Sequence, residues 1–151
     1  MDLDTYVKRI EHLGNNYSQE IWKLLSGVDG YILGIPKQRM YLYGTDANDM
    51  PLVPKYKPST IKKKKKKGQT SSHVTLRHTG LWKASWKLVK VGTKITFTAP
   101  NNAKTGFLVE HYEGNELFGF SPRDGEEIFK RWIKPYIDDI IFPNEKIDIK
   151  I

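Results

Sequence analysis

None of the side chains that commonly act in catalysis or bind metals forms a recognisable motif in this chain. The sequence contains no cysteine, which excludes disulfides, zinc–thiolate sites and cysteine nucleophiles. The histidines lack the spacing of a zinc site; they are His12, His73, His78 and His111. Three acids lie close enough in sequence to mimic the carboxylate pair of a hydrolase; they are Glu110, Glu113 and Glu116. Because charged strand faces are common and no phosphate-binding glycine loop occurs, we expect no enzymatic activity, no cofactor and no metal site.

A basic segment between Leu52 and Gly68 is the most prominent feature of the sequence. It holds eight lysines and no acid, and the other 17 Lys and Arg residues of the chain balance its 17 Asp and Glu residues. The eight are Lys55, Lys57, Lys62, Lys63, Lys64, Lys65, Lys66 and Lys67. Such a segment could neutralise DNA phosphates or meet an acidic protein surface. No aromatic residue interrupts the run from 62 to 67 to stack on bases, so base-specific recognition is not expected.

The composition predicts one folded domain over residues 1–151. Of these residues 38% are hydrophobic and 12% aromatic, enough to bury one core. No run approaches the roughly 18 apolar residues that a membrane span needs. The first residues, 1–4, are acidic and lack the apolar stretch of a secretory signal. We therefore expect a protein made and folded in a cytoplasm, with no membrane and no small molecule as partner.

The N-terminal region predicts amphipathic helix. Apolar residues recur at helical spacing over 3–13 and again over 17–28, separated by the weak breaker Gly14–Asn16. Either one long interrupted helix or two helices would satisfy this pattern, ending near Ser26–Gly27.

The following region is predicted to be irregular. Glycines and a proline interrupt residues 29–36, and residues 40–43 form a short strand candidate. Residues 44–72 are rich in Asp, Asn, Pro, Lys and Ser and predict a long loop. Within it, the run from 62 to 67 should be extended and mobile, because like charges repel one another.

The centre of the chain predicts a β-hairpin. Residues 88–91 and 94–98 flank Gly92–Thr93, and apolar residues alternate with threonines in the second strand. Residues 107–112 predict a further strand or a short helix. These elements indicate a small α+β domain.

A helix start is the clearest local signal. Ser121 occupies the position of an N-cap, Pro122 the first helical position and Asp124 the third, as in a capping box. Apolar residues follow at helical spacing over 128–141, and Pro135 should kink this helix or end it early.

The tail, residues 143–151, is predicted to be extended. Its alternating isoleucines could add as a strand to a neighbouring subunit; these interface candidates are Ile147, Ile149 and Ile151.

One stretch in the middle of the chain resembles a known family. Residues 77–85 contain a Thr-Gly pair, then a large apolar residue, and then a serine expected to close a short helical turn. This phrase resembles the Mu-type family of virion-morphogenesis proteins, which complete the tail or neck of tailed bacteriophages. The matching residues are Arg77, Thr79, Gly80, Leu81 and Ser85. His78 stands where the family usually has an aspartate.

Three further phrases occur in the order expected of that family, over roughly residues 44–141. Residues 49–62 resemble its proline-rich loop leading into a threonine and lysines. Residues 107–114 resemble its element of an apolar stretch, histidine, aromatic residue and glycine, and residues 118–121 resemble its closing phrase. The structural positions in these phrases are His111, Gly114 and Phe118.

The resemblance implies an α+β fold in which the N-terminal and C-terminal helices pack on a small antiparallel sheet beside a long basic loop. It implies a structural virion protein at the head-to-tail connector, assembled in the bacterial host cytoplasm as a ring, with six-fold or twelve-fold symmetry expected. Its partners would be copies of itself, portal or adaptor proteins and tail proteins, with possible contact to packaged DNA. The lysines would face the DNA channel or an acidic neighbouring protein.

Two other functions remain open on the sequence alone. One is a stand-alone, non-specific nucleic-acid-binding protein that uses the lysine run. The other is a hydrolase that uses Glu110 or Glu113 in a pocket that raises its pKa.

Overall fold

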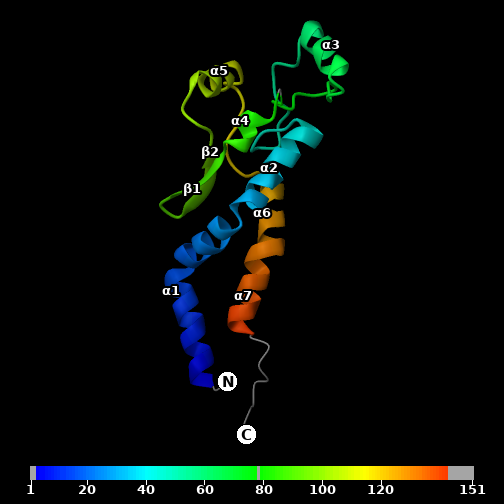
Figure 1. The fold of residues 1–151 in the computed structure, drawn as a ribbon. Helices are drawn as coiled ribbons and strands as arrows, with labels where there is room; N and C mark the ends of the chain where they lie inside the picture. Colours follow the sequence, from blue (N-terminus) through cyan, green and yellow to red (C-terminus); the bar gives the residue numbers. More distant parts are fainter. Residues whose placement is uncertain (1–2, 78, 143–151) are drawn as a thin grey trace. The chain divides into compact units, whose positions relative to one another are not determined.

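The computed structural model describes residues 3–77 and 79–142, and these residues form an α+β fold with a small antiparallel sheet (Figure 1). The α+β class predicted from the sequence is confirmed. The fold consists of two compact units. Among the described residues, the first unit combines residues 3–28 with residues 126–142, and the second spans Asp29–Gly125. The isoleucines predicted to contact a neighbouring subunit, at 147, 149 and 151, lie outside the described residues.

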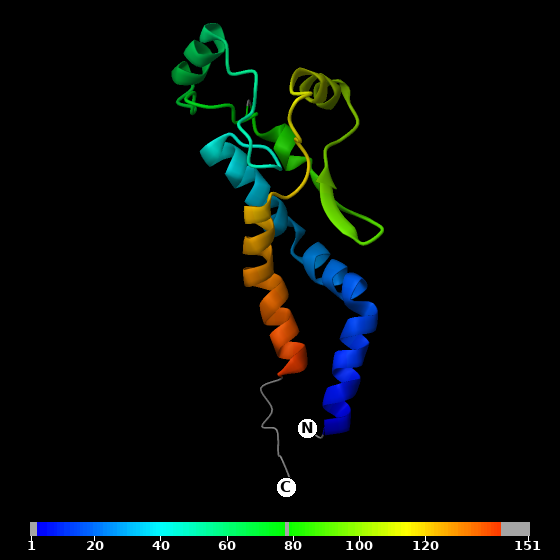
Figure 2. The same ribbon diagram turned by 180° about the vertical axis from the view of Figure 1, so that it is seen from behind.

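The first unit is a pair of helices. Helix α1 (Leu3–Gly27) lies beside helix α7 (Lys134–Ile141) in both views (Figures 1 and 2). Of the two alternatives left open by the sequence, α1 is one continuous helix, and its end at Gly27 agrees with the prediction. A glycine inside a helix costs only about 1 kcal/mol relative to alanine. Burial of Leu13, Ile21 and Leu25 outweighs that cost.

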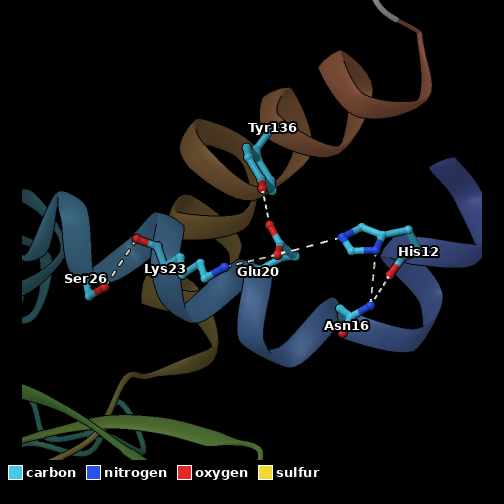
Figure 3. A network of polar contacts seen from close by, with 6 residues as sticks. All are labelled: His12, Asn16, Glu20, Lys23, Ser26 and Tyr136. Atoms are coloured by element: carbon cyan, nitrogen blue, oxygen red, sulfur yellow. Dashed lines mark hydrogen bonds and ion pairs between the residues drawn. The ribbon is translucent and has the colours of Figure 1, made fainter.

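A polar network joins α1 to α7 around Glu20 (Figure 3). The Tyr136 hydroxyl of α7 donates a hydrogen bond to Glu20 Oε2 at 2.8 Å. On the other carboxylate oxygen, Lys23 Nζ lies at 3.6 Å and His12 Nε2 at 4.0 Å. The hydrogen bond from Tyr136 is the largest cause that lowers the pKa of Glu20, and Lys23 adds to it against the effect of desolvation.

Replacing Tyr136 with phenylalanine is therefore expected to raise the pKa of Glu20 toward its usual value of 4.5. The measurement is an NMR titration of the Glu20 side-chain carboxyl carbon. The exposed Tyr17, also on α1, supplies the control, since Tyr17→Phe should leave that titration unchanged. An unchanged Glu20 titration in Tyr136→Phe would show that the hydroxyl does not hold the carboxylate.

The predicted capping box is confirmed at the start of helix α6 (Pro122–Ile128). The Asp124 amide donates to Ser121 Oγ at 3.2 Å, and the Ser121 amide donates to Asp124 Oδ2 at 3.0 Å. The chain stays helical past Pro135, so the predicted early end at this residue is wrong, whereas the alternative of a kink stays a prediction. Between α6 and α7 lies the π-helical turn η1 (Phe129–Ile133), in which the Lys134 amide donates to the Phe129 carbonyl.

Helix α2 (Asp29–Tyr43) opens the second unit, and two predictions for this region are wrong. The residues expected to be irregular are helical, and so are residues 40–43, expected to form a strand. Ile32, Leu33 and Met40 are buried. Their burial outweighs the local preference of glycine and of Pro36, which also lies inside the helix.

The predicted hairpin is confirmed. Strands β1 (Lys87–Val91) and β2 (Lys94–Thr98) pair antiparallel, with Val91 opposite Lys94 across the turn. Gly92 has a φ of +61°, a left-handed conformation that glycine adopts without strain. Helix α2 packs against β1 in this unit.

Three short helices complete the second unit: α3 (Pro58–Lys66), α4 (Leu81–Ala84) and α5 (Ala103–His111). The segment 107–112, predicted as a strand or a short helix, therefore belongs to a helix and its C-cap. Asn102 caps α5 by accepting from the Thr105 amide at 3.0 Å.

An aromatic cluster lies at the centre of the second unit. Trp86 stacks on Phe97 with ring centroids 4.7 Å apart, and Trp82 meets Trp86 edge-on at 5.3 Å. Phe118 packs against all three rings at 6.1–6.3 Å. Offset-stacked and edge-to-face pairs of this kind stabilise a core beyond the area they bury.

A buried carboxylate closes the turn that follows α2. Asp46 Oδ1 accepts from the amides of Asn48 and Met50, and Oδ2 accepts from the Asn115 side chain and the Glu116 amide, all at 2.9–3.1 Å. Burial raises the pKa of Asp46, but these donors outweigh it and hold that pKa below its usual value.

Candidate functional site: a lysine-rich helix and the pocket beside it

The lysine run is helical, which corrects the prediction that it is extended. Helix α3 begins at Pro58, in the first-turn position that proline favours, after the extended residue Lys57. Its lysines lie near the C-terminal end of the helix, where the macrodipole favours cations. The lysines of the segment are exposed except one; the exposed ones are Lys55, Lys57, Lys62, Lys63, Lys65, Lys66 and Lys67.

Lys64 is the exception, and it fixes α3 to the rest of the unit. It is 8% exposed. Its Nζ donates to the Arg77 carbonyl at 2.5 Å and to Gln69 Oε1 at 3.3 Å. The same ammonium lies 4.8 Å from the centroid of the Tyr56 ring, a cation–π contact. One inward lysine therefore holds the helix while its neighbours face outward.

Tyr56 strengthens this attachment. Its hydroxyl accepts from the Thr75 amide at 2.9 Å and lies 3.3 Å from Thr75 Oγ1. The chain before α3, through Tyr56, and α3 itself, through Lys64, are thereby tied to the segment from Thr75 to Arg77. Sequence spacing did not indicate this arrangement, because the partners are 13 to 19 residues apart.

A pocket of about 230 Å³ lies between α3 and α5. Among the described residues, its lining contains five basic residues and no acid. The basic residues are Lys63, Lys64, Lys67, Arg77 and Lys104, and the remaining lining residues are Tyr56, Thr60, Gln69, Leu76, Leu108 and Tyr112. Burial, followed by the neighbouring Tyr56, raises the pKa of Tyr112 to about 12. This tyrosine is therefore neutral at physiological pH. The pocket combines a basic rim with an interior that is apolar apart from the buried Lys64 ammonium.

Leu76 lines this pocket in an unusual backbone conformation. Its φ is +54°, in the left-handed region that residues other than glycine seldom adopt. The side chain is 9% exposed and also belongs to the hydrophobic core. A non-glycine residue in this region costs on the order of 1–3 kcal/mol and persists where surrounding contacts enforce it.

The residues matched by the Thr-Gly phrase build a short turn. Gly80 has a φ of +88° at the N-cap of α4, and the Leu81 amide donates to Thr79 Oγ1 at 3.4 Å. Ser85 closes the turn through its hydroxyl, which donates to the Trp82 carbonyl at 2.6 Å. This turn places Trp82 in the aromatic cluster, while Leu81 remains 73% exposed. His78 lies outside the described residues.

The other predicted family positions lie apart from the lysines. His111 ends α5 and stacks on Phe107, with ring centroids 5.4 Å apart. Gly114 lies in the exposed turn after that helix, and Phe118 packs in the aromatic cluster. Arg77 is exposed and its guanidinium lies 5.8 Å from the Tyr41 ring centroid.

The acids considered for hydrolysis, Glu110, Glu113 and Glu116, are exposed. Within residues 3–77 and 79–142, no group of three or more His, Asp or Glu side chains is arranged to hold a metal ion.

Lys83 is a buried lysine that the sequence pattern did not single out. It is 8% exposed, and its Nζ donates to the Thr75 carbonyl at 2.5 Å. Burial, reinforced by the charges of Arg77, Lys64, Lys37 and Arg39, lowers the pKa of Lys83 to about 7. Its place between two buried tryptophans, Trp82 and Trp86, was the available sequence signal.

Comparison of the chain with protein-family models, with curated protein sequences and with solved structures gives no match. Among the described helices, none has the length and apolar character needed to span a membrane.

Proposed function

We propose that this chain is a structural protein of a tailed-bacteriophage virion, located at the head-to-tail connector or neck. Copies of it would form a ring with six-fold or twelve-fold symmetry and contact portal or adaptor proteins and tail proteins. The proposal assigns no catalytic role to the chain. Four phrases in the order typical of the Mu-type family support it, and within one of them residues 79–85 form a short turn closed by Ser85, as the resemblance implies.

The observation that carries the proposal is the fixed basic face of α3. Five lysines of this helix and its C-cap are exposed, at 62, 63, 65, 66 and 67, while Lys64 anchors the helix. A ring that surrounds DNA or seats on an acidic neighbour needs a basic surface on each subunit, held in a constant position. The pairing of outward charge with one inward anchor provides this surface.

Native mass spectrometry with and without short duplex DNA tests the proposal. We expect a ring, or a monomer that leaves DNA unbound and enters a ring when portal and tail proteins encoded beside it are added. A variant with glutamine at positions 62, 63, 65, 66 and 67 should fold, because it retains Lys64, and should fail to join that assembly.

The rival nucleic-acid-binding function makes a different quantitative prediction. Neutralising five phosphates gives a slope of about −4.5 in log affinity against log salt, which is a loss of roughly 500-fold between 50 and 200 mM. A monomer that binds duplex DNA with this dependence, and loses it in the glutamine variant, would contradict a connector role and support stand-alone DNA binding.

A further inference from the structure

We propose that the pocket between α3 and α5 binds an acidic peptide segment of a partner protein. The segment inserts one bulky apolar side chain, and its flanking carboxylates pair with the basic rim. This inference deepens the proposed function and rests on it only in placing the partner among the neighbouring virion proteins. The argument from charge and shape concerns the second unit alone.

The size of the pocket favours a single side chain. Small-molecule sites typically measure roughly 300–1,000 Å³. The pocket here, at about 230 Å³, lies below that range. Its opposite walls come from separate helices, with Thr60 and Lys63 on α3 and Lys104 and Leu108 on α5. In both views these helices lie on either side of α4 (Figures 1 and 2).

The charge of the rim specifies the flanking residues. Lys63, Lys104 and Arg77 are exposed at the pocket, and no acid of the described part of the chain lines it. Carboxylates that approach this rim gain charge-assisted hydrogen bonds, which are roughly twice as strong as neutral ones. The interior offers mainly apolar surface from Leu76, Leu108 and the tyrosines, so a purely anionic ligand would leave it unfilled.

Nucleic acid fits the pocket less well than a peptide does. Single strands bind through bases that stack on open aromatic faces. Here the Lys64 ammonium lies over the Tyr56 ring, and Tyr112 is only 5% exposed. Duplex DNA presents phosphates but no apolar side chain that could fill the apolar part of this pocket. A protein segment supplies both the apolar anchor and the charges.

Fluorescence anisotropy with labelled, blocked peptides tests this inference at 50 and 150 mM salt. The first probe has a central tryptophan flanked on each side by two glutamates. One companion peptide replaces the tryptophan with alanine, and another replaces the glutamates with glutamine. We expect the first probe to bind at least tenfold more tightly than either companion.

Two variants of the chain locate the binding. Lys104→Glu reverses an exposed rim charge and should weaken binding of the first probe at least tenfold, whereas Lys87→Glu, an exposed charge on β1, should not. Thr60→Trp fills the pocket from α3 and should remove the preference for tryptophan over alanine. Circular dichroism confirms that each variant is folded.

Equal binding of the tryptophan and alanine peptides would overturn the inference, since it would show charge attraction alone. Tighter binding of a ten-nucleotide oligothymidine, blocked by Thr60→Trp, would overturn it in favour of a nucleic-acid site. If the peptides fail while the chain still joins a ring with neck proteins, the pocket assignment is wrong and the connector role stands. If the chain is a DNA-binding monomer but still binds the first peptide, and Thr60→Trp and Lys104→Glu weaken that binding, the pocket assignment stands and the connector role is wrong.

Discussion

Replacing Arg39 with methionine is expected to lower the free energy of unfolding by about 3–5 kcal/mol, the usual effect of leaving one member of a buried ion pair alone. Arg39 of α2 forms an ion pair with Asp124 of α6, and the two residues are 3% and 2% exposed. Burial already raises the pKa of Asp124, and the Ser121 amide and Arg39 offset that effect only in part. Urea-induced unfolding measures the change.

Arg123 provides the matched control for this pair. It neighbours Asp124 on α6 but is exposed, with its guanidinium 5.2 Å from the Tyr43 ring centroid. Arg123→Met should cost no more than about 1 kcal/mol, the size of an exposed cation–π contact. A double variant, Arg39→Met with Asp124→Asn, should be more stable than Arg39→Met alone, because it leaves no unpaired buried charge and keeps an oxygen acceptor for the Ser121 amide. Equal losses for the Arg39 and Arg123 variants would contradict the importance of the buried pair.

The stability of the second unit is expected to rise as pH increases from 7 to 9.5, and Lys83 is the cause. In the folded chain its pKa is about 7, whereas an unfolded lysine titrates near 10.4. Between these values the unfolded state binds a proton that the folded state does not, so raising the pH favours folding. The full effect over this window is on the order of 3 kcal/mol.

Lys83→Met removes this titration. The free energy of unfolding of the wild type, minus that of the variant, should therefore rise from pH 7 to pH 9.5. Taking this difference cancels the contributions of other titrating groups. Stopping at pH 9.5 also avoids the range above 10, where the raised pKa of Tyr112 lowers stability as the pH rises. Urea unfolding at four pH values measures both free energies. Parallel pH profiles for wild type and variant would show that Lys83 keeps an ordinary pKa in the fold.

Local signals predicted the elements that depend on neighbouring residues. The β-hairpin follows from a glycine turn between alternating residues, and the start of α6 follows from the spacing of Ser121, Pro122 and Asp124. Each of these is stabilised by contacts within a few residues, so the sequence alone was sufficient.

Elements stabilised by distant contacts were missed. Helix α2 contains glycines and Pro36, and its helical state depends on burial of side chains such as Ile32 and Met40 against the rest of its unit. Helix α3 was missed because charge repulsion is visible in the sequence, whereas the acceptor for Lys64 is the carbonyl of Arg77. The pocket joins α3 to residues of α5 some forty positions later, which no local pattern indicates.

The π-helical turn η1 determines which side chain of α7 meets α1. A wide turn accommodates one residue more than an α-helical turn, so it has the effect of a one-residue insertion in the helical register. Residues after Ile133 are rotated by about 100° from where an uninterrupted α-helix would place them. Tyr136 reaches Glu20 in this shifted register. The pairing of α1 with α7 in the first unit therefore depends on the number of residues between α6 and α7, and not only on the types of those residues.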